Sequence, residues 1–409
     1  MSTTLLINPT AMEAGLIAAG KSRRLSAARA AAFEAFSRTG LPSKRMEAWK
    51  WTDLRAFLRE NLTPVEPDND VIAPSIFGGL KPFEITIMNG RAEWEGALPA
   101  GVSIAAKPDA RLEGLAADLP LANLAGAMSE ARLEITIAPE ARVDQPILVR
   151  RIAGPGVHNQ RLAVTLGRRA AATIIESFDG VGAYFSNSLS EISIADGAAL
   201  MRLVLQDGAD SGVETSLAVA TLGAGAEFHQ TALLLGAKAA RLETRLSCEG
   251  AGAKTSLRGA TALSGARHAD LTSEARHAAP GCTTRQSHKS AVRDRARAVF
   301  QGKFLVARGA QKTDAQMSAN ALLLSDAAEV NHKPELEIYA DDVQCAHGST
   351  AGALDADVVF YLRQRGLDEH SARALLVEAF LNDAFEEIAH PGIHNVFHRR
   401  MLHWLGSAT

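Results

Sequence analysis

The residues best suited to chemistry lie within positions 341–350, whose sequence is DDVQCAHGST. Cys345 and His347 are two positions apart, so on a β-strand both side chains point to the same face. A thiol and an imidazole on one face can bind a soft metal ion or part of an iron–sulfur cluster, and the thiol can also act as an activated thiolate. The neighbouring carboxylates of Asp341 and Asp342 disfavour a thiolate, which argues against the activated nucleophile.

Two ligands from one chain do not complete an iron–sulfur cluster, which normally has four. If Cys345 and His347 hold a metal or a cluster, the remaining ligands must come from another subunit or a mobile donor. The pair therefore favours a transient site shared at an interface over a stored cofactor. The alternative for Cys345 is structural, because a lone cysteine is often a small buried hydrophobic residue.

Other cysteines and histidines give weaker signals. They are His268, His277, His288 and Cys282, and further along the chain His394 and His398. The histidines of the first group lie further apart in the sequence than the short ligand pairs of zinc sites. We therefore predict that they are surface or hydrogen-bonded core residues. The later pair stands at i and i+4 on a predicted helix, where a solvated face is favoured over a metal site.

Composition limits the class of protein. The 409 residues carry a formal net charge of −3, so the basic excess of a nucleic-acid binder is lacking. The three cysteines are widely spaced without a C-x-x-C motif, which argues against a disulfide framework. Neither a run of eighteen apolar residues nor a secretory leader is visible. We expect a soluble, cytoplasmic protein that binds neither nucleic acid nor membrane.

From about residue 131 the hydrophobic pattern alternates as in β-strands. Strictly alternating segments are 132–137, 160–166 and 190–194. Small-residue turns follow at Gly197, Gly225 and Gly252, separated by nearly equal intervals, and an earlier turn lies at 169–171. A regular recurrence over intervals of this length predicts the stacked coils of a β-solenoid. A β-sandwich is the rival, but its turns recur every ~8–12 residues.

Helical regions are expected on both sides of the solenoid. Residues 10–60 have apolar positions at helical spacing, with Trp49 and Trp51 as packing anchors of this segment. A linker rich in Pro and Asp is expected at residues 61–82. The chain thus divides into an N-terminal helical region with its linker, a β-solenoid core and a C-terminal helical region. The three parts are 1–82, 83–352 and 353–409.

The C-terminal region is expected to form helices at 355–365 and 368–387, and a last one at 393–405. Gly366 is the expected C-cap of the first helix, and Asp368 is the expected N-cap of the second. An apolar stripe on the second helix either covers an open end of the solenoid or docks a partner. The stripe consists of Ala372, Leu375, Leu376, Ala379, Phe380 and Phe385.

Five segments of the chain resemble the SufB/SufD family, the scaffold subunits of the SUF machinery that assembles iron–sulfur clusters. They are residues 45–54, 277–289, 300–303, 310–325 and 334–366. The first, RMEAWKWTDL, resembles the family's R-x-E-x-W-[KR]-[YW]-T-[DN]-L motif. The last contains the form C-x-H-G, which is similar to the SufD branch of the family. The chain departs from the pattern at Ala321 and Gln364, where Leu and Ser are usual.

The resemblance implies a mainly β protein with a right-handed parallel β-helix core flanked by helices, and a non-catalytic scaffold subunit rather than an enzyme. It also implies pairing with a SufB-like subunit through the ends of the β-helices. Cys345 and His347 would lie at that interface, with His347 the stronger candidate ligand. They would share a transient iron–sulfur cluster with the partner, and the isolated chain would bind none stably.

A second implied partner is a SufC-like ABC-type ATPase, which would supply ATP hydrolysis in trans. The chain itself contains no G-x-x-x-x-G-K-[ST] phosphate-binding loop. The residues that would dock the ATPase are Phe360, Tyr361, Leu362, Arg365, Leu375, Leu376 and Phe380. Two alternatives stay open: a homodimeric scaffold that works without a SufB-like subunit, and a polysaccharide-active β-helix enzyme. The second is disfavoured because such enzymes are typically secreted.

Overall fold

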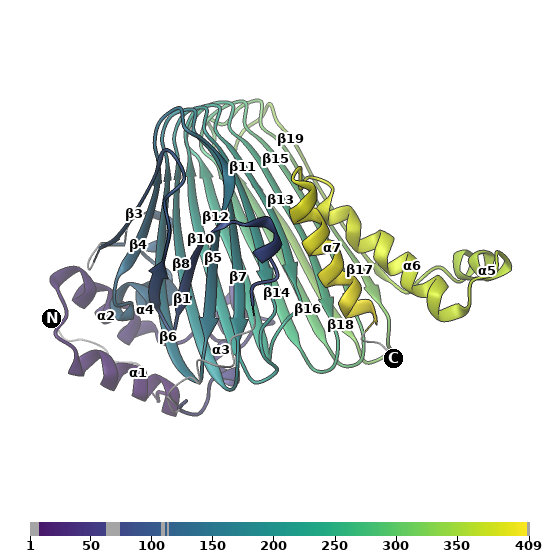
Figure 1. Cartoon of the computed structure of the whole chain (residues 1–409), viewed down its shortest axis with the longest axis horizontal. Helices are drawn as coiled ribbons and strands as arrows, with labels where there is room; N and C mark the ends of the chain where they lie inside the picture. The colour runs from purple at the N-terminus through teal and green to yellow at the C-terminus, as the bar shows by residue number, and fades with distance from the viewer. Residues whose placement is uncertain (1–7, 63–73, 108–110, 113, 407–409) are drawn as a thin grey trace.

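The computed structural model describes residues 8–62, 74–107, 111–112 and 114–406. The protein is mainly β, and its strands stack coil upon coil into two long sheets (Figure 1), which confirms the predicted solenoid. Half of the linker expected at residues 61–82 falls on residues 63–73, which lie outside the described residues. The other half is not a plain linker, because it contains a 3-10 turn at Gly78–Leu80 and the buried Phe77, which packs in the cluster over sheet A. No helix in the described chain is both long enough and apolar enough to cross a lipid bilayer.

From β4 onward, consecutive strands alternate between the two sheets, so each coil adds one strand to each sheet. Sheet A has the order β19 (Gln344–Gly352), β17 (Asp314–Leu323), β15 (Thr283–Val292), β13 (Lys254–Leu263), β11 (Glu227–Leu234), β9 (Ala199–Gln206), β7 (Ala171–Gly180), β5 (Arg142–Ala153), β1 (Phe83–Met88) and β2 (Arg91–Trp94). Sheet B has the order β18 (Glu329–Ile338), β16 (Arg297–Val306), β14 (His268–His277), β12 (Ala239–Cys248), β10 (Val213–Leu222), β8 (Tyr184–Ile194), β6 (Gly156–Leu166), β4 (Arg132–Ile137) and β3 (Val102–Lys107). The pairs β1–β2 and β3–β4 are antiparallel, and the other strand pairs are parallel.

A column of left-handed residues marks the turn of each coil. Their φ angles lie between 55° and 71°, a region in which residues with a Cβ are uncommon. The column consists of Glu140, Arg169, Gly197, Gly225, Gly252, Gly281 and Lys312. Each backbone N–H in the column donates to a carbonyl of the next coil at 2.6–3.0 Å. The turns predicted from the sequence are confirmed, including the one at Arg169, where no glycine marks it.

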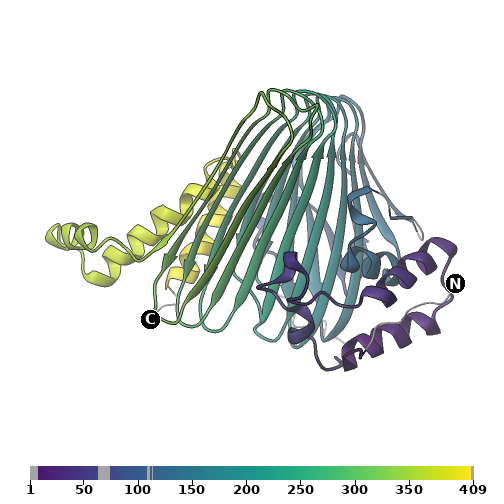
Figure 2. The same ribbon diagram turned by 180° about the vertical axis from the view of Figure 1, so that it is seen from behind.

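Helices cover the outer faces of the two sheets, one group on each (Figures 1 and 2). The N-terminal group consists of α1 (Ala11–Ser22), α2 (Ala27–Thr39), the 3-10 turn η1 (Glu47–Trp49), α3 (Leu54–Phe57) and α4 (Pro120–Met128). The C-terminal group consists of α5 (Ala356–Gln364), α6 (Glu369–Asn382), the 3-10 turn η5 (Asp383–Phe385) and α7 (Pro391–Gly406). Two further 3-10 turns are η3 (Gly78–Leu80) and η4 (Gly114–Ala116). The N-terminal group packs on sheet B, and α6 and α7 pack on sheet A.

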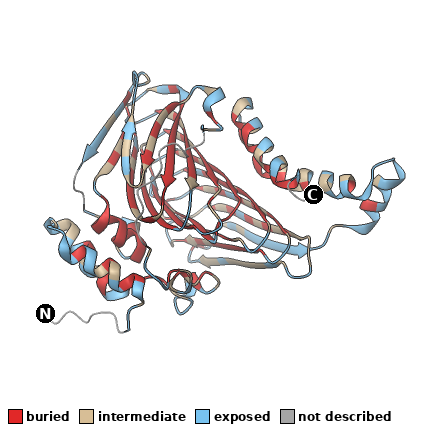
Figure 3. Ribbon diagram, turned by 60° about the horizontal axis from the view of Figure 1, so that its bottom comes forward, coloured by how far each residue is buried: buried red, intermediate tan, exposed pale blue. Residues whose placement is uncertain are grey.

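The C-terminal helices do not cover the end of the solenoid. Apolar residues of α6 and α7 pack against the outer face of β5 to β15, because leucines and alanines point outward there. Figure 3 shows this buried face as red segments along the helices. The end strands β18 and β19 consist of half-buried and exposed residues, and α5 projects away from the body (Figure 1). Asp355 and Asp368 cap α5 and α6, and the N-cap predicted at Asp368 is thereby confirmed.

Between the sheets, apolar side chains fill most of the interior, but one charged cluster is buried with them. The Glu176 carboxylate on β7 accepts from Arg151 Nη2 at 2.6 Å and from Arg202 Nε at 2.7 Å, and all three side chains are almost fully buried. Burial alone would raise the pKa of Glu176, but the guanidiniums of Arg202 and Arg151 outweigh it and lower the pKa to about 2. The interior therefore holds charged side chains, and the distances between them depend on the register of neighbouring coils.

Replacing Glu176 by Gln is expected to leave two buried guanidiniums without their counter-ion. Removing one partner of such a network destabilises a protein by about 3 to 5 kcal/mol. Because the pKa of Glu176 is lowered to about 2, its ionised form stabilises the fold above its usual pKa of 4.5, and this contribution is lost as the pH falls toward 2. Urea unfolding at several pH values should therefore show a less steep loss of stability in Glu176→Gln over that range.

The control for this variant is Glu34→Gln, which removes an exposed ion pair with Arg38 on α2. Its unfolding midpoint should stay close to that of the parent protein at all pH values. Equal midpoints for Glu176→Gln and Glu34→Gln would contradict the role assigned to the buried cluster.

Candidate cysteine–histidine sites and docking surfaces

Cys345 and His347 lie on β19, the last strand of sheet A. Their neighbours on β17 are Ala315 and Met317, both buried in the solenoid interior. Cys345 and His347 thus occupy the interior-facing row of an end strand that no later coil covers in the described chain. Cys345 is half-buried and His347 is exposed. The two side chains are on one face, where a second molecule can complete a ligand set.

The Cys345 thiol is held in its protonated form. Burial raises the pKa of Cys345, and the charge of Asp314 raises it further. The sequence also predicted that this thiol is not activated, but the main cause of its raised pKa is burial and not the adjacent carboxylates. Asp342 instead forms an ion pair with Lys312 on the adjacent turn. This cysteine is therefore better placed as a ligand, which a metal would deprotonate, than as a free nucleophile.

The residues expected to dock an ATPase divide into two groups. Exposed ones are Phe360 (61%), Tyr361 (55%), Leu375 (46%) and Arg365. Half-buried ones are Leu362, Leu376 and Phe380. Phe380 packs with the apolar cluster over sheet A, and Lys289 Nζ lies 5.1 Å from its ring centroid. The exposed group presents aromatic and aliphatic side chains to solvent, while Phe380 helps to fix α6 on the body.

A second cysteine–histidine group lies inside the solenoid. The sequence grouped His277 with Cys282 but favoured a structural role for them, and it did not connect Cys248 to either residue. Cys248 ends β12, and His277 is its register partner at the end of β14. Cys282 stands in the turn before β15. The three ligand atoms all lie within 4.8 Å of one another, and all three residues are buried. One full coil separates Cys248 from His277, so the short ligand spacings of zinc motifs could not reveal this group. The regular length of the solenoid coils was the signal that could have revealed it.

Interactions within this group distinguish the two thiols. The neighbouring Cys248 thiol lowers the pKa of Cys282; burial opposes this shift, and the nearby His277 ring adds to it. The neighbouring Cys282 thiol and burial raise the pKa of Cys248. Cys282 Sγ also lies 3.3 Å from the Ala279 carbonyl oxygen. His277 Nε2 lies 3.1 Å from Thr284 Oγ1.

His268 and His288 confirm the prediction of hydrogen-bonded core histidines. His268 Nε2 is 2.9 Å from Thr52 Oγ1, and His288 Nε2 is 3.1 Å from Thr261 Oγ1. The His288 ring also stacks on Phe300, with ring centroids 5.3 Å apart. Burial lowers the pKa of both histidines, that of His288 to about 3. Both rings are therefore neutral structural groups.

One of the two tail histidines, His398, connects two helices. His394 and His398 lie on α7 with ring centroids 6.1 Å apart. His398 Nε2 is 2.9 Å from the Glu378 carboxylate on α6. This contact ties α7 to α6, which gives His398 a structural role.

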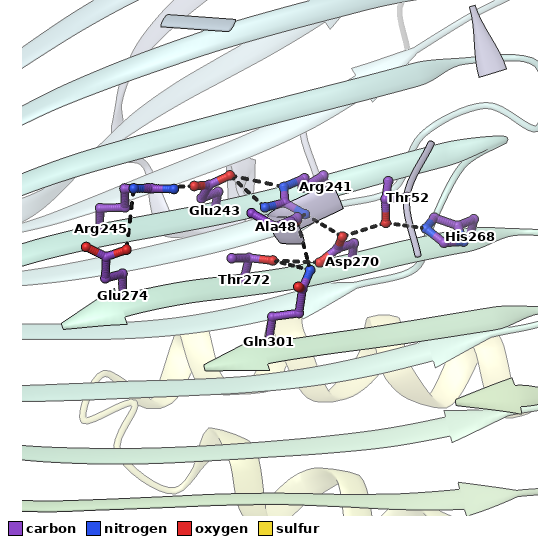
Figure 4. Close-up of polar contacts among 10 residues, drawn as sticks. All are labelled: Ala48, Thr52, Arg241, Glu243, Arg245, His268, Asp270, Thr272, Glu274 and Gln301. Carbon is purple, nitrogen blue, oxygen red and sulfur yellow. Dashed lines mark hydrogen bonds and ion pairs between the residues drawn. The ribbon is translucent and has the colours of Figure 1, made fainter. Parts of the chain in front are cut away.

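The N-terminal segment is anchored on sheet B by a buried polar network (Figure 4). Thr52 Oγ1 donates to Asp270 Oδ2 at 2.5 Å, and Arg241 Nη1 donates to the same oxygen at 2.6 Å. Arg241 Nη1 also reaches the Ala48 carbonyl oxygen at 2.9 Å, and its guanidinium lies 4.0 Å from the Trp49 ring centroid. Trp49 is buried, so its predicted role as a packing anchor is confirmed. The network extends along sheet B through Glu243, Arg245 and Glu274 (Figure 4).

The two stacked sheets, the anchored N-terminal segment and the edge strand that carries Cys345 and His347 together define a β-solenoid protein. Two family models match it: the SufBD core domain of SUF system FeS cluster assembly over residues 150–380, and the SufBD N-terminal region over residues 6–65. Since the first covers more than half of the chain, the protein belongs to the SufB/SufD family, and its role lies in iron–sulfur cluster assembly.

Individual relatives agree with this assignment. The iron–sulfur cluster assembly protein SufD of Escherichia coli is 28% identical over 374 residues, 87% of each chain. A SufBD family protein of Synechocystis is 34% identical over 240 residues, covering 56% of this chain and 52% of the relative. A SufBD family protein of Mycobacterium leprae is 26% identical over 400 residues, 94% of each chain. The similarity to SufD thus extends over most of the protein.

The anchor predicts a large effect of Trp49→Ala. Truncating a fully buried tryptophan costs about 3 to 5 kcal/mol, and here it also removes the aromatic face under Arg241. Limited proteolysis should cut within residues 8–62 faster in this variant, while circular dichroism should show the β-solenoid intact. Trp51→Ala is the matched control, because Trp51 is only half-buried. Equal cleavage rates in the two variants would contradict the anchoring role.

Proposed function

We propose that this protein is a non-catalytic scaffold subunit for iron–sulfur cluster assembly, which pairs with a SufB-like subunit across the β18–β19 end and binds a SufC-like ATPase through α5 and α6. The observation that carries the proposal is the open end of the solenoid. Both sheets stop there at exposed edge strands, and one of these carries Cys345 and His347.

Exposed edge strands are a liability in soluble proteins, because their unpaired N–H and C=O groups template aggregation. β19 is nine residues long, and it has a neighbour on one side only in the described chain. A second solenoid of the same kind would pair with this edge by strand addition. Pairing would bring the partner's end strands next to Cys345 and His347 and could supply the missing ligands. A second copy of this chain could use the same edge, which is the homodimeric alternative.

The ligand types fit a transient iron–sulfur cluster as cargo. Thiolate and imidazole are both ligands of iron in clusters, and two of them hold a cluster only with help from the partner. Such a site releases its cluster when the partner moves, as an assembly scaffold requires. The free cysteines of the chain also suit a reducing compartment, and we propose a cytoplasmic location.

The ATPase contact is supported by the exposed apolar side chains on the projecting helices. Phe360 and Tyr361 on α5 and Leu375 on α6 are exposed, although α5 and α6 are held in place by capping and packing. Clustered exposed apolar residues mark protein interaction sites. Because α5 begins shortly after β19 ends, an ATPase bound to α5 and α6 would lie beside a second solenoid paired at the β18–β19 end.

Co-purification tests the partners. The tagged chain, expressed with its genomic neighbours, should elute with an ABC-type ATPase and a second β-solenoid subunit in stoichiometric amounts. Phe360→Asp should remove the ATPase and leave the second subunit bound, because the new carboxylate would be buried without a partner. Val181→Asp is the control, since Val181 is also exposed but lies on the body of the solenoid. Elution of the chain alone or as a homodimer would contradict the heterocomplex.

His347→Ala tests the shared ligand site. Since His347 is exposed, the variant should keep the unfolding midpoint and the subunit composition of the complex. The rate of cluster assembly in the purified complex should fall about tenfold or more, a loss typical of mutating a residue at a metal site. His403→Ala, which changes an exposed histidine on α7, should assemble clusters at the parent rate. A His347→Ala protein that fails to fold would show that His347 is structural.

A further inference from the structure

We propose that Cys248, His277 and Cys282 form a buried binding site for a single transition-metal ion that accepts thiolate and imidazole ligands, such as Zn²⁺. The site is separate from the Cys345–His347 edge and is built from this chain alone. It does not depend on the proposed scaffold function.

The ligand atoms are already close to the positions that an ion requires. Zinc bonds of about 2.3 Å to sulfur and 2.0–2.1 Å to nitrogen, in tetrahedral geometry, place ligand atoms roughly 3.5–3.8 Å apart. In this structure the two sulfurs and one ring nitrogen of His277 lie within 4.8 Å of one another. Small side-chain rotations, which move each ligand atom by about 1 Å, would close the site around an ion. The backbone positions need not change, because the strand register fixes Cys248 beside His277.

The hydrogen bonding of His277 is incomplete without a further group. The residue is fully buried, and its Nδ1 has no hydrogen-bond partner among the described residues. Buried polar atoms are rarely left unpaired, so such an atom calls for an explanation. An ion bound at Nδ1 would satisfy it and would leave Nε2–H to donate to Thr284 Oγ1, 3.1 Å away. The Thr284 hydroxyl would orient the His277 ring, as the hydrogen-bond partners of metal-binding histidines commonly do.

The surroundings of the three residues favour a bound ion over free thiolates. Cys248 and Cys282 belong to the apolar interior cluster, together with Ala253, Ala279 and Phe304. A pair of thiolates would be costly in this environment, but a divalent ion would neutralise their charge. Two soft sulfur ligands and one imidazole select zinc, copper(I) or iron over calcium and magnesium. Three protein ligands also leave one coordination position open for a water molecule or an exogenous sulfur ligand.

The site lies two coils away from the exposed edge. Thr284 pairs with Ala315 on the next strand of sheet A, and Ala315 pairs with Cys345 on the last. Two strand spacings correspond to about 10 Å. Entry would require opening of the turn at 278–281, in which Pro280 and Gly281 are exposed. Because all three ligands are buried, the ion would be loaded during folding or slowly afterwards.

Metal analysis of the full chain tests the proposal. The protein is expressed in zinc-supplemented medium, purified with reductant and dialysed against a weak chelator. It should retain about one Zn²⁺ per chain. Refolding in Co²⁺ should give the visible absorption of a tetrahedral cobalt–thiolate site. Both readouts should be the same in Cys345→Ser and His347→Ala, which alter only the exposed edge.

Variants of the buried ligands should lose the ion. Cys282→Ser and Cys248→Ser should each retain less than a tenth of the parent zinc content, and the cobalt–sulfur absorption should weaken. Thr284→Val removes the orienting hydroxyl and should weaken zinc affinity by about 10 to 100 times, measured by chelator competition. Circular dichroism verifies that each variant is folded, so a folding failure is told apart from loss of a ligand.

Three results would overturn the proposal. One is a parent chain that retains no zinc after both expression with zinc and refolding with it. Another is full zinc retention by folded Cys282→Ser together with folded Cys248→Ser. The last is a Cys248–Cys282 disulfide in protein purified with reductant, which would show that the thiols pair with each other instead. A failed co-purification with an ATPase would leave the metal proposal untouched, because that experiment tests only the partners.

Discussion

The backbone ladder between successive coils is the interaction on which the rest of this structure depends. Each strand of the stacked coils pairs in parallel with the strand one coil earlier, at a separation of about 4.8 Å. The ladder continues around the turns, where left-handed residues such as Arg169 and Gly252 donate to the next coil. The coils differ in length, since the step from Leu222 to its partner Cys248 is shorter than the step from Val306 to its partner Ile338. The register, rather than a fixed repeat length, decides which side chains meet.

Register explains why polar groups can lie inside a solenoid. Glu176 meets Arg202 and Arg151 because three neighbouring strands of sheet A present them at nearby positions. Cys248 meets His277 by the same mechanism on sheet B. A slip of one residue would turn each of these side chains to the opposite face of its sheet. Buried charges and ligands are therefore signs of a strictly fixed coil stacking.

The helices at the two ends of the chain are placed differently on the solenoid, and the proposed pairing depends on that difference. N-terminal helices are locked onto sheet B by Trp49, Arg241 and Asp270. The C-terminal helices lie on sheet A and leave the last coil uncovered. A scaffold that must pair end to end needs its helices on the outer faces, because a helix across the last coil would block the partner. The same placement lets α5 project from the body.

The sequence by itself determined the strands, the regularly recurring turns, the N-cap at Asp368 and the family, because alternation, small residues and motifs are local signals. It placed Cys345 and His347 on one face by strand geometry alone. Only the tertiary structure brought Cys248, His277 and Cys282 together, and only it put the C-terminal helices on sheet A instead of over the open end. The first depends on coil register and the second on outward-facing leucines. Contacts between residues one or more coils apart leave no local pattern in the sequence.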